Sequence, residues 1–282
     1  MNWLVYSLIT VILWGVGQVL IKKGFTNISS LWSLVISASI NALVYIPFAL
    51  LTGATFSISP LFFVVIFVIT ALNMFFFYAI EKGQLAFSGT IFATYPVTTI
   101  VLSYIFLQEN PSAFQFLMIA LILFGSGLLA YTAKSDGKKQ TLFHSWIFWA
   151  LLGSIGVGTA DFLAKISIGE VGLPTYNLFF PITYILGLCG YWFIDKNGRN
   201  LSKNILPKQF IWTIGGVLLL TLGLLSFNYA LEHGNVSIVA TISSSYAALT
   251  ILLAYIFLHE KISRQQLVAI VCIVIGIIFI GF

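Results

Sequence analysis

The stretch "YIFLQENPS" at residues 104–112 recurs almost unchanged as "YIFLHEKIS" at residues 255–263. Around these phrases, residues 78–131 align with residues 229–282 without a gap, and 20 of the 54 aligned positions are identical. Apolar sequence gives some identities by chance. It does not readily place Glu-x-Gly and Phe-Leu-x-Glu in the same register twice. The sequence therefore predicts an internal duplication.

The duplication extends to the start of the chain. Upstream, Trp3, Gly15 and Lys22 align with Trp146, Gly158 and Lys165, and the change in alignment offset places an insertion in the second copy at 195–208. The predicted domains are a first repeat at 1–133, a connecting loop at 134–145 and a second repeat at 146–282.

The composition is that of a membrane protein. Hydrophobic residues make up 60% of the chain, charged residues only 7%, and the mean hydropathy is +1.04. A soluble domain has about 25% charged residues, because its surface faces water. Crossing the hydrocarbon core takes roughly 20 helical residues. We therefore predict an all-α integral membrane protein with ten transmembrane helices, at 3–21, 32–52, 60–80, 85–107, 113–133, 146–167, 175–194, 209–230, 236–258 and 265–282.

Five helices per repeat decide how the repeats are oriented. A second copy that follows an odd number of spans enters the bilayer upside down, so the repeats are predicted to be inverted. Twelve of the 13 Lys and Arg residues then fall on one side, with Lys165 as the exception. Basic loops favour the cytoplasm, which predicts a multi-pass plasma-membrane protein with both termini extracytoplasmic.

Catalysis and metal binding find little support in the sequence. The three histidines lie in or beside loops, and both cysteines, Cys189 and Cys272, fall inside apolar segments. We find neither a zinc-protease motif nor a nucleophile elbow nor a phosphate-binding loop. The chain is therefore predicted to be no enzyme and to need no cofactor or metal, and a lipid flippase or a membrane-embedded lipid-modifying enzyme is kept as the alternative.

The architecture resembles a known family. The segments "LWGVGQVLIKKG" and "GVGTADFLAKI", each in the first helix of a repeat, and the "FLxE" turn before the last helix of each repeat are similar to those of EamA-type transporters of the drug/metabolite transporter superfamily. Two features depart from that pattern. The turns lack the family's glycine before the glutamate, and the charge pattern places both termini outside, whereas many relatives are thought to keep theirs in the cytoplasm. The resemblance implies alternating access around a central cavity near the bilayer midplane.

Polar side chains recur at helical spacing within the apolar segments. One stripe holds Ser7, Thr10, Trp14, Gln18 and Lys22, a second Ser154, Gly158, Asp161 and Lys165, and others Ser33, Ser37, Asn41 and Tyr45, and Asn177, Pro181 and Tyr184. Lipid does not favour such faces, so they point into a bundle or a cavity. The predicted substrate-binding residues are Trp14, Gln18, Asn41, Tyr45, Tyr95, Asp161, Asn177, Tyr184 and Tyr246.

Each polar residue also has a purely structural interpretation. Small and hydroxyl residues in membrane helices are more often packing devices than ligand contacts. Glu109 and Glu260 are expected to cap or pair locally, with a gate role as the alternative. Asp161 and Lys165, four residues apart, form either a static ion pair or a coupling site in which Asp161 binds a proton or a cationic group.

We therefore predict a secondary active transporter, an exporter of small organic solutes such as amino acids or metabolites. Its expected partners are a small-molecule substrate and the lipid bilayer, with no nucleic acid. The chain is expected to act as a monomer, and proton coupling is left open beside facilitated diffusion.

Overall fold

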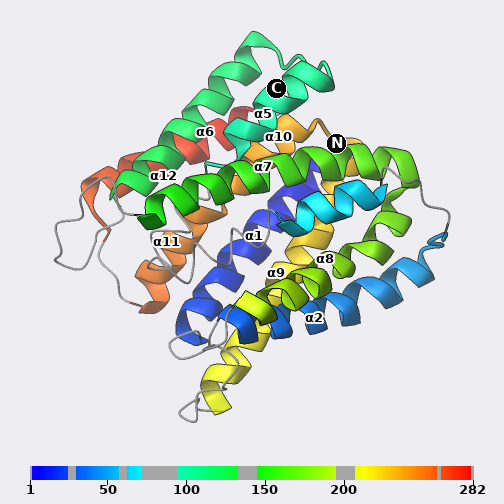
Figure 1. The fold of residues 1–282 in the computed structure, drawn as a ribbon. Coiled ribbons are helices and arrows are strands. Elements are labelled where there is room, and N and C mark those ends of the chain that lie inside the picture. The colour runs from blue at the N-terminus through cyan, green and yellow to red at the C-terminus, as the bar shows by residue number, and fades with distance from the viewer. Residues whose placement is uncertain are drawn as a thin grey trace.

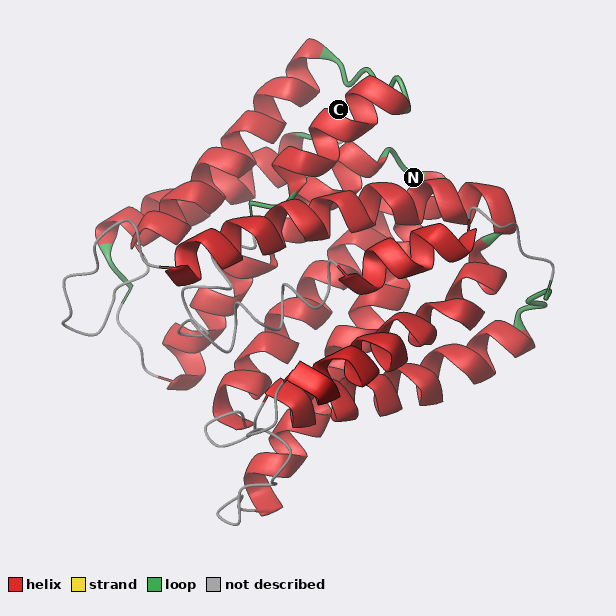
Figure 2. Cartoon of the chain, in the orientation of Figure 1, coloured by secondary structure: helices red, strands yellow, loops and turns green. Residues whose placement is uncertain are grey.

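The computed structural model describes residues 2–24, 30–56, 62–71, 94–132, 145–194, 207–258 and 262–280. Regular structure in these ranges is helical throughout, as Figure 2 shows. The helices are α1 (Asn2–Gly24), α2 (Ser30–Leu51), a short helix at Phe62–Ala71, α5 (Pro96–Phe106), α6 (Ala113–Thr132), α7 (Ser145–Val171), α8 (Leu173–Ile194), α9 (Pro207–His233), α10 (Val236–Ser244), α11 (Tyr246–Leu258) and α12 (Arg264–Phe279).

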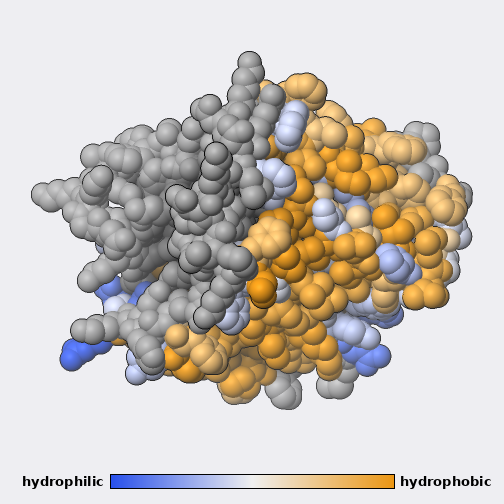
Figure 3. All heavy atoms as spheres, turned by 90° about the horizontal axis from the view of Figure 1, so that it is seen from below, coloured by the Kyte–Doolittle hydropathy of each residue, from blue (hydrophilic) through white to orange (hydrophobic). Residues whose placement is uncertain are grey.

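Among the described residues, four stretches are long and apolar enough to cross a membrane by length and composition: Asn2–Ile21, Leu34–Leu51, Phe210–His233 and Val236–Phe257. Large apolar side chains face outward on several helices, with Leu51 87% and Phe193 74% exposed. The part of the lower face that is coloured in Figure 3 is largely hydrophobic. Such a surface suits lipid rather than water. The all-helical membrane class is thus supported, and the number of spans stays a prediction.

The stretch predicted as one span at 236–258 is two helices, because the chain turns at Ser245 between α10 and α11. The Ser244 and Ser245 hydroxyls donate to the carbonyls of Thr241 and Ile242 at 2.7 and 2.5 Å. Hydroxyls that bond back to the preceding turn bend membrane helices.

The first repeat turns at the aligned position. Residues Thr94–Tyr95 form a turn, and α5 begins at Pro96, which aligns with Ala247. Proline suits a first helical position because it has no amide hydrogen to leave unpaired. A turn therefore precedes α5 and α11 at aligned positions, with serines before α11 and a proline at the start of α5.

The last residue of the repeated phrase starts a helix in both copies. Ser112 and Gln115 exchange two hydrogen bonds, in which the Ser112 amide donates to Gln115 Oε1 at 3.0 Å and the Gln115 amide donates to Ser112 Oγ at 3.2 Å. Ser263 and Gln266 repeat this capping box at 2.8 and 3.3 Å before α12. Each box satisfies two amides that a helix start leaves unpaired.

Helices α6 and α12, the last of each repeat, pack through reciprocal contacts (Figure 1). A methyl group on Gly125 would lie 2.7 Å from the Ala269 carbonyl oxygen, and one on Gly276 would lie 3.1 Å from that of Met118. In the alignment Gly125 matches Gly276 and Met118 matches Ala269, so one contact is the exchanged copy of the other. Exchanged contacts of this kind are what a two-fold relation between repeats produces.

The same reciprocity holds in the interior. Thr99 Oγ1 donates to the Gly158 carbonyl at 3.1 Å, and the aligned Thr250 Oγ1 donates to the Gly15 carbonyl at 3.4 Å. The first helix of each repeat thus packs against the aligned helix of the other repeat, α7 against α5 and α1 against α11. Only a glycine allows this approach, since a methyl group on Gly158 would lie 2.7 Å from Thr98 Cβ.

The matched helices α1 and α7 run in opposite directions, as Figure 1 shows. A methyl group on Gly234 would lie 3.0 Å from Trp3 Cγ near the start of α1, and Lys165 Nζ near the end of α7 donates to the Gly234 carbonyl at 3.1 Å. The start of one repeat's first helix and the end of the other's therefore meet at the turn between α9 and α10.

Candidate functional site

The polar stripe of α1 is used largely for packing against α9. Thr10 Oγ1 and Trp14 Nε1 donate to the carbonyls of Gly223 and Leu220, each at 3.1 Å, and Ser226 Oγ of α9 donates to the Tyr6 carbonyl at 2.8 Å. These bonds support the packing interpretation for the stripe's hydrogen-bonding atoms. The ring of Trp14 keeps a second role, because it faces the interior.

The Trp14 ring belongs to an aromatic group with Phe227, Tyr246 and Tyr95. Its centroid lies 5.5 Å from that of Phe227 and 5.6 Å from that of Tyr246, which it meets edge to face. Tyr95 interacts electrostatically with Tyr246, and its hydroxyl donates to the Ala240 carbonyl at 3.1 Å. The structure thus brings together three of the predicted site residues, and Phe227 is an addition.

A second aromatic group forms where α2 meets α8. The centroid of Phe180 lies 5.4 Å from that of Tyr45 and 5.7 Å from those of Tyr176 and Tyr184. The Tyr45 hydroxyl is buried and has no hydrogen-bond partner. Tyr45 and Tyr184 were predicted from the sequence. Tyr176 and Phe180 were not, because an aromatic residue in an apolar segment carries no mark of its function.

Two amides beside this group are incompletely bonded. Asn228 Nδ2 donates to Asn177 Oδ1 at 2.9 Å, whereas the buried Nδ2 of Asn177 has no partner. Asn41 Nδ2 donates to the Ser37 carbonyl at 2.7 Å, and its buried Oδ1 has no partner. A buried unpaired polar atom costs roughly 1–3 kcal/mol, so each such atom calls for an explanation. Asn228 was missed because α9 shows no polar stripe at its position.

Asp161 interacts with one residue of each aromatic group. It interacts electrostatically with Tyr95 of the first and with Tyr176 of the second, and its Oδ2 is buried without a hydrogen-bond partner. In the alignment Asp161 matches Gln18, which is half-buried on α1. A carboxylate and an amide thus occupy equivalent positions in the two repeats.

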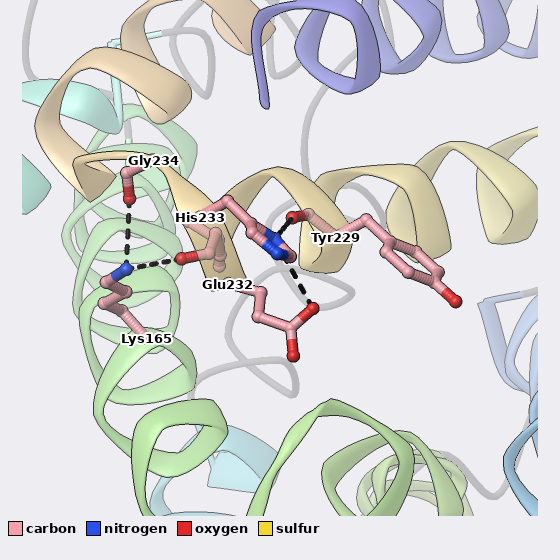
Figure 4. A network of polar contacts seen from close by, with 6 residues as sticks. Lys165, Tyr229, Glu232, His233 and Gly234 are labelled. Atoms are coloured by element: carbon pink, nitrogen blue, oxygen red, sulfur yellow. Dashed lines mark hydrogen bonds and ion pairs between the residues drawn. The ribbon is translucent and has the colours of Figure 1, made fainter. Parts of the chain in front are cut away.

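The structure does not form a static ion pair of Asp161 with Lys165, which was one of the two alternatives for these residues. Lys165 Nζ donates to the carbonyls of Leu231 and Gly234 at 2.5 and 3.1 Å, as Figure 4 shows. The ion pair that Figure 4 shows near Lys165 joins two other described residues, Glu232 and His233, at 3.5 Å. The side chain of Lys165 extends toward the end of α9, where helix carbonyls lack partners, and so leaves the aspartate without its expected partner.

Within the described ranges, we find no group of three or more His, Cys, Asp or Glu side chains that could hold a metal ion. The described interior combines aromatic surfaces with a few unpaired donors and acceptors, a composition that sites for organic molecules also have.

Comparison with known proteins agrees with this architecture. The model of the EamA-like transporter family matches residues 1–131 and again residues 144–282. An uncharacterized protein of Methanocaldococcus jannaschii is 38% identical over 82 residues, which are 28% of this chain and 60% of that protein, so the match spans less than two thirds of the relative.

A solved crystal structure is similar over 97% of this chain and 94% of its own, with a TM-score of 0.79 and 14% identity, and at that identity it shows the fold alone. The family match is the stronger finding, because it covers nearly the whole chain in two consecutive copies that coincide with the duplication. The chain belongs to the EamA-like transporter family.

Proposed function

We propose that the protein is a secondary active exporter of small organic solutes such as amino acids or metabolites in the plasma membrane. It works as a monomer of ten spans, in which two inverted five-helix repeats give access to a central site alternately from either side. The observation that carries the proposal is the buried Oδ2 of Asp161, which has no hydrogen-bond partner among the described residues, on a carboxyl group that interacts electrostatically with Tyr95 and Tyr176.

Asp161 is the coupling residue in this proposal. A charge at the centre of a membrane helix costs about 2.5–3.5 kcal/mol on insertion scales, so an ionisable residue there without a structural partner points to function. Asp161 takes up a proton or the cationic group of a solute in one access state and releases it in the other. Lys165 does not share this role, because its ammonium bonds to the end of α9.

The unpaired protein atoms indicate which polar groups a solute should carry. Asn41 Oδ1 needs a donor and Asn177 Nδ2 needs an acceptor, while the Tyr45 hydroxyl can pair with either a donor or an acceptor. An amino acid carries both kinds of group, and aromatic rings nearby suit its apolar part. A bound solute that forms hydrogen bonds with these atoms would remove the free-energy cost of leaving them unpaired.

Ligand binding is tested by thermal melting of the purified protein with a panel of amino acids, nucleobases, monosaccharides and aromatic cations. A solute at a hundred times its Kd stabilises the folded state by about 2.7 kcal/mol, so a true substrate raises the melting temperature. The variant Asn177→Leu should lose the shift, and its own melting temperature should lie below that of the wild type, because the buried Nδ2 of Asn228 loses its acceptor. A panel without any shift, or an equal shift in Asn177→Leu, contradicts the proposed site.

The orientation is a separate prediction. If the basic loops lie in the cytoplasm, a fluorescent reporter that matures only there is active when inserted within 195–208 and inactive when fused after Phe282. The insertion in the second repeat holds Lys196, Arg199 and Lys203, which makes it the strongest cytoplasmic signal of the chain. Reporter activity at the C-terminus alone would reverse the assignment.

A further inference from the structure

The loop after α5 reaches from the first repeat to the first turn of α10 in the second. The Glu109 carboxylate accepts three hydrogen bonds there, from the amide of Val236 at 2.8 Å, the amide of Ser237 at 3.1 Å and the hydroxyl of Ser237 at 2.6 Å. The residue at the ordinary capping position, Asn235, makes no side-chain cap bond. The cap of α10 thus comes from the other repeat.

A strained turn aims the glutamate. Gln108 has a φ of 53°, in the left-handed region that residues other than glycine seldom adopt. The amides of Leu107 and Glu109, on either side of it, both donate to the Ser103 carbonyl, at 3.0 and 3.3 Å. Glycine would adopt this backbone conformation without steric cost, whereas the side chain of Gln108 makes it unfavourable. Strain that persists in a folded structure marks a position that the surroundings impose.

A cation binds the opposite side of the turn that joins α9 to α10. Lys165 Nζ bonds to the Leu231 and Gly234 carbonyls, which terminate α9 just before α10 begins (Figure 4). Negative charge is favourable at a helix N-terminus and positive charge at a C-terminus, because the peptide dipoles align along the axis. The short α9–α10 turn is therefore held between an anion and a cation from two different elements.

The helix that is held in this way is the most enclosed of those described. All nine residues of α10 are buried, and the helix packs against α1, α5, α6, α7 and α9. Any movement that separates the repeats at this end must pull the Glu109 loop away from α10. Three hydrogen bonds to a carboxylate, two of them from a helix end, would break together.

We infer that Glu109 acts as a latch. Together with Lys165 it keeps closed the end of the molecule at which α1 begins, and release of the latch opens this end. The inference rests on the proposed function, since it assigns one step of alternating access to a named contact. In the alignment, Lys165 matches Lys22 and Glu109 matches Glu260. The side chains of Lys22 and Glu260 lie outside the described part of the structure, so the latch concerns this end alone.

The test measures opening without any solute, so it is independent of whether the substrate has been identified. In a background with Cys189→Ser and Cys272→Ser, Thr241→Cys places a thiol one turn inside the latch, at a fully buried position of α10. The rate of its reaction with a hydrophilic maleimide in lipid nanodiscs reports the population of the open form. Ile273→Cys, buried between α6 and α12, serves as a second reporter away from the latch.

Glu109→Gln keeps the size of the side chain but leaves a single acceptor oxygen for three donors. We expect it to raise the labelling rate at position 241 by about tenfold or more while the rate at position 273 stays unchanged. The matched control is Glu170→Gln, an exposed glutamate near the end of α7, which should leave both rates as they are. Ser237→Ala removes one of the three bonds and should give a smaller increase at position 241.

An unchanged rate at position 241 in Glu109→Gln overturns the latch, as does an equal rise at positions 241 and 273, which would show general loosening of the bundle. If Glu109→Gln does not fold, Ser237→Ala decides, and an unchanged rate there has the same consequence. Latch release without transport of any panel solute would instead count against the proposed function alone.

Discussion

Gly158→Ala is expected to destabilise the folded protein by about 1–3 kcal/mol or more, because it forces apart two helices whose backbones touch. The added methyl group would meet the Tyr95 carbonyl oxygen and lie 2.7 Å from Thr98 Cβ and 3.1 Å from the Thr99 amide nitrogen. A backbone atom cannot relieve a steric clash by changing rotamer, as a flexible side chain can. The hydrogen bond from Thr99 to the Gly158 carbonyl would be lost as the helices separate.

Two other glycines provide the controls. Gly169 lies on the same helix with open space around it, so Gly169→Ala should leave the melting temperature unchanged or raise it slightly. Gly15 matches Gly158 in the alignment, but its nearest neighbour is the Leu249 side chain, at 2.7 Å, which can adjust. Thermal melting in detergent should therefore rank the losses as Gly158 first, Gly15 second and Gly169 last. Equal losses at Gly158 and Gly169 would contradict the close packing of α5 against α7.

Asp161→Asn is expected to abolish pH-driven transport while leaving a folded protein. Because Lys165 is bonded to the end of α9, removing the carboxylate leaves no unpaired cation behind, so the melting temperature should not fall. A neutral amide can neither exchange a proton nor balance a cationic group, so coupling to the pH gradient is lost. Asp161→Glu, which keeps a carboxylate, should retain part of the coupling.

The exchange Asp161→Lys with Lys165→Asp separates this account from a static ion pair. A pair would be restored by the exchange, whereas here the exchange should destabilise the protein, because an aspartate at 165 would face the carbonyls at the end of α9. A folded Asp161→Asn variant with unchanged pH-driven transport would remove Asp161 from the mechanism.

Much of the fold could be predicted because the chain is duplicated. The alignment that matches Ser112 with Ser263 and Gly125 with Gly276 also predicts which contacts occur twice, and the capping boxes and the α6–α12 glycines follow it. The division of 236–258 at Ser245 could not be predicted. Serines in an apolar segment either bend the helix or only pack, and tertiary contacts decide between the two.

The contacts of the candidate site residues followed from the sequence only in part. Helical spacing put Trp14, Tyr45 and Tyr184 on polar faces, and in the structure Trp14 meets Tyr246 while Phe180 lies beside both Tyr45 and Tyr184. Spacing of four residues wrongly paired Asp161 with Lys165, since a long side chain can reach other partners that only the fold brings near. The capping of α10 by Glu109 was missed for the same reason. The sequence suggested that Glu109 caps a helix nearby in the chain, whereas its partner is more than a hundred residues away.

The central claim is that the protein moves small organic solutes through a site between its repeats. The direct measurement is uptake of a radiolabelled mixture of amino acids, nucleobases and monosaccharides into proteoliposomes under an imposed pH gradient. Wild-type vesicles should accumulate label above protein-free vesicles, and a protonophore or Asp161→Asn should abolish the accumulation. Accumulation in wild-type vesicles no greater than in protein-free vesicles would contradict the account.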